Sequence, residues 1–136
     1  MLPRLLLTAF LLAHGLIHAG FIAPAPRAPA GGPAWPFVMD RSWALSPLGL
    51  GPDIARVLGT AFVVLTIVGF AVAALVAFGI LPASLWAPSV AVGALASMAV
   101  LVLFFHPWLI LGVAIDVGLL WVVLVAHWEP SATALG

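Results

Sequence analysis

Four long apolar stretches constrain this chain more than any other feature of its sequence. Each is long enough, or nearly so, to cross about 30 Å of hydrocarbon as an α-helix. Only 6% of the 136 residues are charged, whereas 65% are hydrophobic. A soluble domain has roughly a quarter charged residues, so a water-solvated surface cannot be built from this composition. We therefore predict one all-α domain over residues 1–136, an integral membrane four-helix bundle.

Prolines, a capping residue and tryptophans mark the ends of the predicted spans. Pro107 suits the first position of a helix, and Asp53 is predicted to cap the second span. Trp86, Trp108 and Trp128 fall near predicted helix ends, at the interfacial depth that indole rings prefer. The predicted spans cover residues 5–23, 54–81, 89–105 and 108–128, with a proline-rich loop over 24–52. Because the other connections are short, neighbouring spans should run antiparallel, up and down.

Two features of the first half leave alternatives open. The later part of the long loop, WPFVMDRSWAL, either rests on the membrane interface or forms an irregular loop. The start of the chain has features of a secretory signal, with Arg4, an apolar core and the small residues Ala23 and Ala25. We expect the first span to be retained. Basic residues would place the long loop in the cytoplasm, but the signal-like start favours the opposite side.

Several polar side chains occur in the same half of the predicted bilayer. Counting about 1.5 Å per residue from the end bearing the long loop places His14 and Asp116 roughly 13 Å deep. His18 lies one turn shallower on the same helical face as His14, and Ser97 and Thr60 reach comparable depths. Ionisable groups in hydrocarbon are costly and normally find partners. We therefore predict a polar site of His14, His18 and Asp116, supported by Ser97 and Thr60.

Three functions fit such a site. A His-x₃-His pair and a carboxylate from another helix can bind one divalent metal ion, with His14, His18 and Asp116 as ligands, and the site would then hold a metal ion or a redox cofactor in an accessory subunit of a larger assembly. Haem fits less well, because His18 and His106 would differ in depth by roughly 8 to 9 Å. Alternatively, His14 and Asp116 titrate together in a small homo-oligomeric, proton-linked transporter. The third possibility is a purely structural membrane subunit. His106 and His127 are predicted to be interfacial residues near helix ends.

The sequence argues against several other classes of function. No basic run is present, so we expect no nucleic-acid partner. The chain has no cysteine, which excludes thiolate nucleophiles and cysteine-based metal sites. Neither a nucleophile elbow around Ser97 nor a glycine-rich phosphate loop occurs, so hydrolase and nucleotide-binding functions are set aside, and enzymatic activity stays open. The expected partners are the lipid bilayer and either a second copy or a larger membrane assembly.

Small residues predict where the helices touch. Gly69 and Gly93 begin rows of small residues at four-residue spacing, which mark the contact faces of the second and third spans. Gly112 and Gly118 flank Asp116 and are expected to let another helix approach it closely. If the chain is a structural subunit, enlarging Gly69 should release a partner protein.

The segment HGLIHAGFIAP, residues 14–24, resembles the opening of uncharacterised small bacterial four-span membrane proteins with an HGLxHxxGF-like first helix. The resemblance covers about a dozen residues and the four-span layout. It implies a recurring group of His14, Gly15, His18, Gly20 and Phe21, and we expect the chain to lie in a bacterial inner membrane. The resemblance implies no activity.

Overall fold

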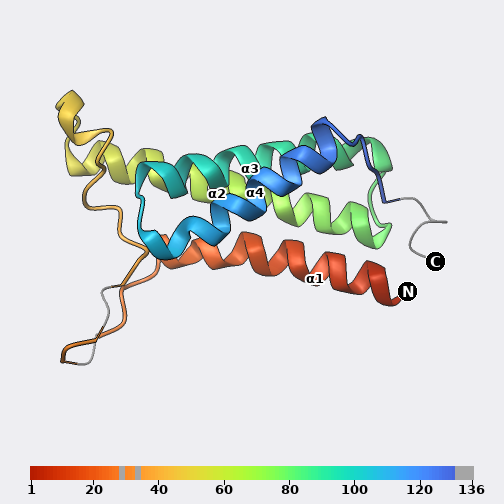
Figure 1. Ribbon diagram of the computed structural model, residues 1–136, viewed down its shortest axis with the longest axis horizontal. Helices are drawn as coiled ribbons and strands as arrows, with labels where there is room; N and C mark the ends of the chain where they lie inside the picture. The colour runs from red at the N-terminus through yellow and green to blue at the C-terminus, as the bar shows by residue number, and fades with distance from the viewer. Residues whose placement is uncertain (28–29, 33–34, 131–136) are drawn as a thin grey trace.

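The computed structural model describes residues 1–27, 30–32 and 35–130. Within these ranges the chain is all-α and has no strand, as predicted (Figure 1). Its long helices are α1 (Leu2–Ile17), α2 (Pro52–Phe78), α3 (Trp86–Leu103) and α4 (Ile110–Leu124). Short 3₁₀ helices cover His18–Phe21, Ser46–Leu48, Ala83–Leu85 and Pro107–Leu109. Together with the adjoining 3₁₀ turns, these form four helical segments long and apolar enough to cross a membrane.

Successive helices run in opposite directions, so α1 begins and α4 ends at the same end of the bundle (Figure 1). The long loop and the α3–α4 turn lie at the other end, which we call the loop end. The closest backbone packing is between sequence neighbours: α1 with α2, α2 with α3, and α3 with α4. The backbones of α1 and α4 approach each other at few positions. Side chains therefore make the main connection across the seam between α1 and α4.

The start of α2 differs from the prediction by two residues. The N-cap is Gly51, Pro52 occupies the first helical turn, and Asp53 follows it without a capping hydrogen bond. The prediction that Asp53 caps the helix was therefore wrong. Proline is well suited to the first helical position, because it lacks an N–H that would have no partner there, and this moves the cap to the residue before it. Asp53 still lies in the first turn, where the helix dipole favours a negative charge.

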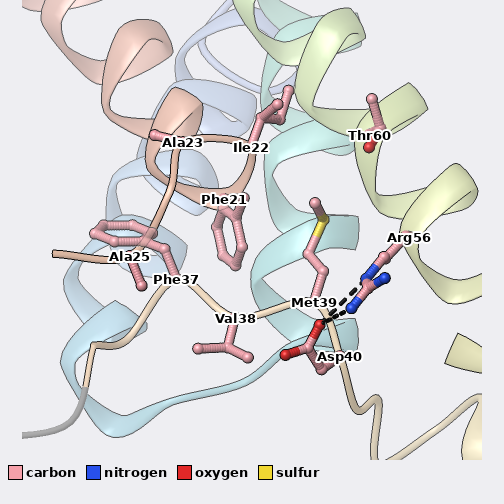
Figure 2. Close-up of a pocket in the computed structure, with 10 residues that line it drawn as sticks. All are labelled: Phe21, Ile22, Ala23, Ala25, Phe37, Val38, Met39, Asp40, Arg56 and Thr60. Atoms are coloured by element: carbon pink, nitrogen blue, oxygen red, sulfur yellow. Dashed lines mark hydrogen bonds and ion pairs between the residues drawn. The ribbon is translucent and has the colours of Figure 1, made fainter. Parts of the chain in front are cut away.

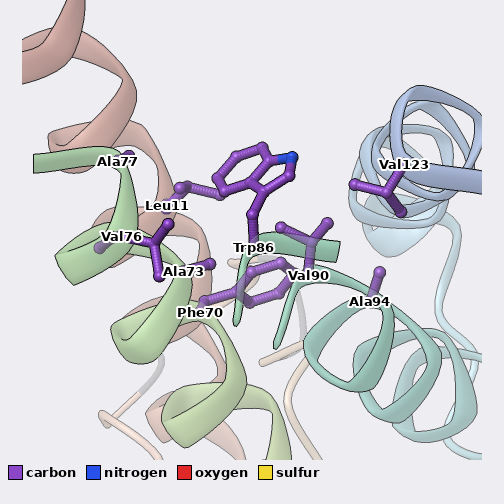
Figure 3. Packing of buried hydrophobic residues seen from close by; sticks show 10 residues of the cluster. Leu11, Phe70, Ala73, Val76, Ala77, Trp86, Val90, Ala94 and Val123 are labelled. Atoms are coloured by element: carbon purple, nitrogen blue, oxygen red, sulfur yellow. The ribbon is translucent and has the colours of Figure 1, made fainter. Parts of the chain in front are cut away.

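The bundle core depends on close contact between α2 and α3. A methyl group replacing the Gly69 hydrogen would lie 2.6 Å from the backbone nitrogen of Gly93, so these two backbones touch. One core cluster is built around Leu11, Phe70, Trp86 and neighbouring small side chains (Figure 3). The Trp86 ring is buried inside the bundle rather than lying at its surface, and its Nε1–H donates a hydrogen bond of 2.8 Å to the carbonyl oxygen of Trp128.

The later part of the long loop is fastened across the loop end. Ser42 Oγ donates a hydrogen bond of 2.7 Å to the carbonyl oxygen of Leu103, and Trp43 Nε1 donates one of 2.6 Å to that of Val102. These carbonyls belong to the last turn of α3, where helices lack their own donors. Met39 is buried, and a methyl group on Gly59 would collide with its sulfur. We call this fastened segment, residues 37–45, the strap.

Candidate functional site

Helices α1 and α4 bring His14 and Asp116 into direct contact in the interior of the bundle. The Nε2 atom of His14 lies 2.8 Å from Oδ1 of Asp116. His14 is 7% exposed and Asp116 is 0% exposed, so water scarcely reaches this pair. The structure therefore joins the two residues that the depth count placed at one level, and it does so across the seam where the backbones stay apart.

Ser97 of α3 and His18 complete the arrangement. With Asp116 ionised, Ser97 Oγ donates a hydrogen bond of 2.5 Å to Asp116 Oδ2, and it also lies 2.8 Å from His18 Nε2. His18 Nδ1 lies 2.9 Å from the carbonyl oxygen of His14. Ser97 and His18 are both buried. We call these four side chains the polar network: a chain of hydrogen bonds that ties α1, α3 and α4 together.

Aromatic and small residues enclose the network. The ring of Phe70 meets the His14 ring edge-on, with 5.0 Å between the centroids. A methyl group on Gly15 would lie 3.1 Å from Cβ of Phe70, so a small residue is needed there for α1 to sit close to α2. Hydrogen bonds in such an apolar setting are strong, and a polar atom left without a partner is costly.

The hydrogen-bond geometry determines how many protons the network needs. Carbonyl oxygens only accept hydrogen bonds, so His18 Nδ1 must carry a proton to bond the His14 carbonyl. His14 Nε2 likewise donates when Asp116 is ionised. The Ser97 hydroxyl has one hydrogen but faces two acceptors, Asp116 Oδ2 and the free lone pair of a neutral His18 Nε2. Neutral imidazoles and an ionised carboxylate thus supply three protons for four hydrogen bonds.

One additional proton satisfies the whole network, and it can reside at either end. If Asp116 carries it, the carboxylic acid donates to Ser97 and the Ser97 hydroxyl donates to His18. If His18 carries it, His18 donates to Ser97 and Ser97 donates to the carboxylate. The first arrangement leaves all four side chains uncharged, whereas the second places opposite charges in an apolar interior, which is costly. Ser97 therefore sits where it can pass a proton between Asp116 and His18.

A cavity of about 160 Å³ adjoins the network between α1 and α4. His14 and His18 line its inner part, and Phe37 and Trp108 line it toward the loop end. One water molecule occupies about 30 Å³ in the liquid, so this space holds a few waters or a small group of atoms. The cavity extends from the level of the two histidines toward the loop end.

Thr60 does not join the polar network. It lies on the face of α2 that meets the strap, where it lines a different pocket together with Arg56 and Met39. Its side chain faces the strap side of α2 and not the polar network. Rise per residue predicts depth, whereas the direction of a side chain around the helix axis depends on packing.

The two remaining histidines lie near helix ends. His106 precedes the 3₁₀ turn that leads into α4, and its Nδ1 accepts a hydrogen bond of 3.3 Å from the backbone N–H of Trp108. His106 thus caps this turn. His127 follows α4 and is exposed, with a backbone φ of 49°. This left-handed conformation turns the chain away from the helix.

The described part of the chain contains no group of three or more His, Cys, Asp or Glu side chains arranged to hold a metal ion. His14, His18 and Asp116 are close, but three of their ring nitrogens and both carboxylate oxygens are engaged in hydrogen bonds. A metal ion bound by both histidines would have to replace a hydrogen bond of His18, whereas His14 Nδ1 has no hydrogen bond to the described residues.

Comparison with known proteins adds no further information about the site. No protein-family model, curated protein or solved structure matches the chain.

Proposed function

We propose that this chain is a small integral membrane protein of the bacterial inner membrane that binds a proton reversibly in its polar network and serves proton-linked transport. One observation carries the proposal: four hydrogen bonds join groups that hold three protons in their ordinary neutral and ionised forms. A bound proton completes the network, and its loss leaves His18 Nε2 facing Ser97 without a hydrogen between them. Loss of the proton therefore weakens a link between α1 and α3.

The cavity along the α1–α4 seam supports a route for the proton. It lies against both histidines and extends toward the loop end, so water within it could connect the network to the membrane surface. Four helices enclose little space for a larger substrate, so a transport pathway would require at least two copies of the chain. The metal-ion hypothesis has less support, because both ring nitrogens of His18 already have partners.

Infrared spectroscopy of the protein in lipid tests proton binding directly. The chain has four acidic residues, and Asp116 is the buried one. We expect a protonated-carboxyl C=O band, brought in by lowering the pH, that is absent in Asp116→Asn and shifted in Ser97→Ala. Ser89→Ala is the matched control, since Ser89 is also a buried serine of α3 but bonds only carbonyls of its own helical segment. A wild-type spectrum without this band would contradict the uncharged network.

Proteoliposomes with an internal pH indicator test transport. After an imposed pH step, vesicles with the wild-type chain should equilibrate faster than vesicles with Asp116→Asn. Equal rates for wild-type, variant and empty vesicles would contradict the transport function. Elemental analysis of the same preparation tests the metal-ion hypothesis. One bound metal ion per chain, lost in His14→Ala, would show that the network is a metal site and contradict the proton site.

A further inference from the structure

A second pocket lies at the loop end, outside the polar network. Its volume is about 350 Å³, and its walls are the end of the 3₁₀ helix His18–Phe21 with the residues that follow it, the strap, and the first turns of α2 (Figure 2). Phe21, Ile22 and Met39 give it an apolar side. Arg56 and Asp40 give it a charged side, and the dashed lines in Figure 2 join their side chains.

We propose that this pocket binds the headgroup of a phospholipid that carries both a phosphate and a primary ammonium group, as an ethanolamine phospholipid does. The proposal rests on the membrane location proposed above but not on proton binding. At the loop end, the first turns of a membrane-spanning α2 lie at the depth of lipid headgroups, and the apolar side of the pocket offers a surface for the adjoining acyl chains.

The charged side of the pocket favours a headgroup with both signs of charge. Arg56 donates from Nε and Nη2 to the same oxygen of Asp40, Oδ1, at 3.1 and 2.5 Å. Among the described residues, none donates a hydrogen bond to the second carboxylate oxygen, Oδ2. The guanidinium has five N–H donors, so further donors face outward for a phosphate. A primary ammonium can bond Asp40 Oδ2, whereas a quaternary choline group has no N–H to donate.

Exposure and position support the same occupant. The side chains of Arg56 and Asp40 are 55% and 61% exposed, so a ligand can reach both. Their formal charges cancel, which disfavours a headgroup with net charge. Thr60 lies one helical turn beyond Arg56 and lines the pocket; its hydroxyl bonds to none of the described residues and is available to a phosphate or glycerol oxygen.

Native mass spectrometry with equimolar ethanolamine, choline and glycerol phospholipids of equal chain length tests the proposal. We expect about a tenfold preference of the wild-type chain for the ethanolamine lipid over the other two, the size expected for one charge-assisted hydrogen bond. Arg56→Gln should lose this preference. Asp40→Asn should shift it toward the anionic glycerol lipid, since the pocket then carries a net positive charge. Arg41→Gln is the matched control, because Arg41 is exposed and does not line the pocket.

Equal retention of the three lipids by the wild-type chain would overturn the proposal, as would an unchanged preference in Asp40→Asn. Soluble phosphoethanolamine distinguishes the source of the headgroup: if it competes as well as the lipid does, the site is one for a soluble zwitterion and the lipid proposal fails. Circular dichroism verifies that each variant is folded. The chain could be extracted only with detergent and yet show no lipid preference. This result would overturn the headgroup proposal but not the membrane location.

Discussion

Ser97 is the residue on which the interior of this molecule depends most. It is one hydroxyl between an imidazole and a carboxylate, with short contacts to both. Its size matters as much as its chemistry, because it lies in α3 where the neighbouring helices are close. A side chain without a hydroxyl would leave Asp116 Oδ2 and His18 Nε2 facing an apolar methyl group.

We expect Ser97→Ala to lower the free energy of unfolding by about 1–3 kcal/mol, the usual cost of leaving buried polar atoms without partners. Thr60→Ala should change it by less than about 0.5 kcal/mol, because Thr60 is partly exposed and outside the network. Unfolding of both variants in mixed micelles with increasing denaturing detergent measures the difference. Equal effects of the two substitutions would show that the network adds no stability.

His14 and His18 have different tasks in this geometry. His14 only has to donate to Asp116, whereas His18 has to donate from Nδ1 and accept or donate at Nε2. A glutamine amide can also donate, so His14→Gln is expected to retain the infrared band of the protonated Asp116. His18→Phe should shift that band strongly, because Ser97 then loses the acceptor for its hydrogen. The opposite ranking of the two variants would contradict the assigned direction of the hydrogen bonds.

At the scale of helices, the row of small residues on α2 serves contact within the chain. Gly69 touches the backbone of Gly93, so this face is not available to another protein. Enlarging Gly69 would disturb this internal contact, and loss of a partner protein in such a variant stays a prediction. Of the two glycines near Asp116, Gly112 packs against Leu101, whereas a methyl group at Gly118 would meet nothing within 4 Å.

We expect substitution by alanine to have opposite effects on stability at Gly69 and at Gly118. Gly69→Ala should destabilise the bundle by about 1–3 kcal/mol, because the added methyl group forces two backbones apart. Gly118→Ala should be neutral or stabilising by up to about 1 kcal/mol, since alanine favours a helix and the space is open. Detergent-induced unfolding followed by circular dichroism compares them. A neutral Gly69→Ala would show that the two helices are not in contact.

Much of this element-level structure could be predicted from the sequence. Long apolar stretches identify helices, and a constant rise per residue places His14 beside Asp116 in depth. Rotation about each helix axis was not predictable, which is why Thr60 was assigned to the wrong site. The contacts of Ser42 and Trp43 with α3 were also beyond the sequence, because they join an irregular segment to residues about 60 positions away.

At the scale of the whole molecule, the strap joins parts of the chain that are far apart in sequence. It covers the end of α3, supplies Met39 to the space above Gly59, and forms one wall of the second pocket. Phe37 also lines the cavity that leads to the histidines. Both pockets therefore depend on where the strap lies.

Trp43→Phe should loosen the strap while retaining an aromatic ring, because it removes the N–H that bonds the Val102 carbonyl. We expect cleavage within residues 37–45 by a protease to become several-fold faster, in line with the loss of one hydrogen bond of about 1 kcal/mol. Trp108→Phe is the matched control, since the exposed Trp108 ring has no such bond among the described residues. Equal cleavage rates in the two variants would show that the bond does not hold the strap.

The fastening of Ser42 and Trp43 to Leu103 and Val102 has a consequence for biogenesis. A ribosome makes the chain from the N-terminus at about 5–20 residues per second, so the segment around Trp43 emerges several seconds before its acceptors exist. During that interval the Trp43 N–H has no Val102 carbonyl to bond in the nascent protein. Chaperones and quality-control proteases would thus meet this segment first, and completion of the third helix would end their access.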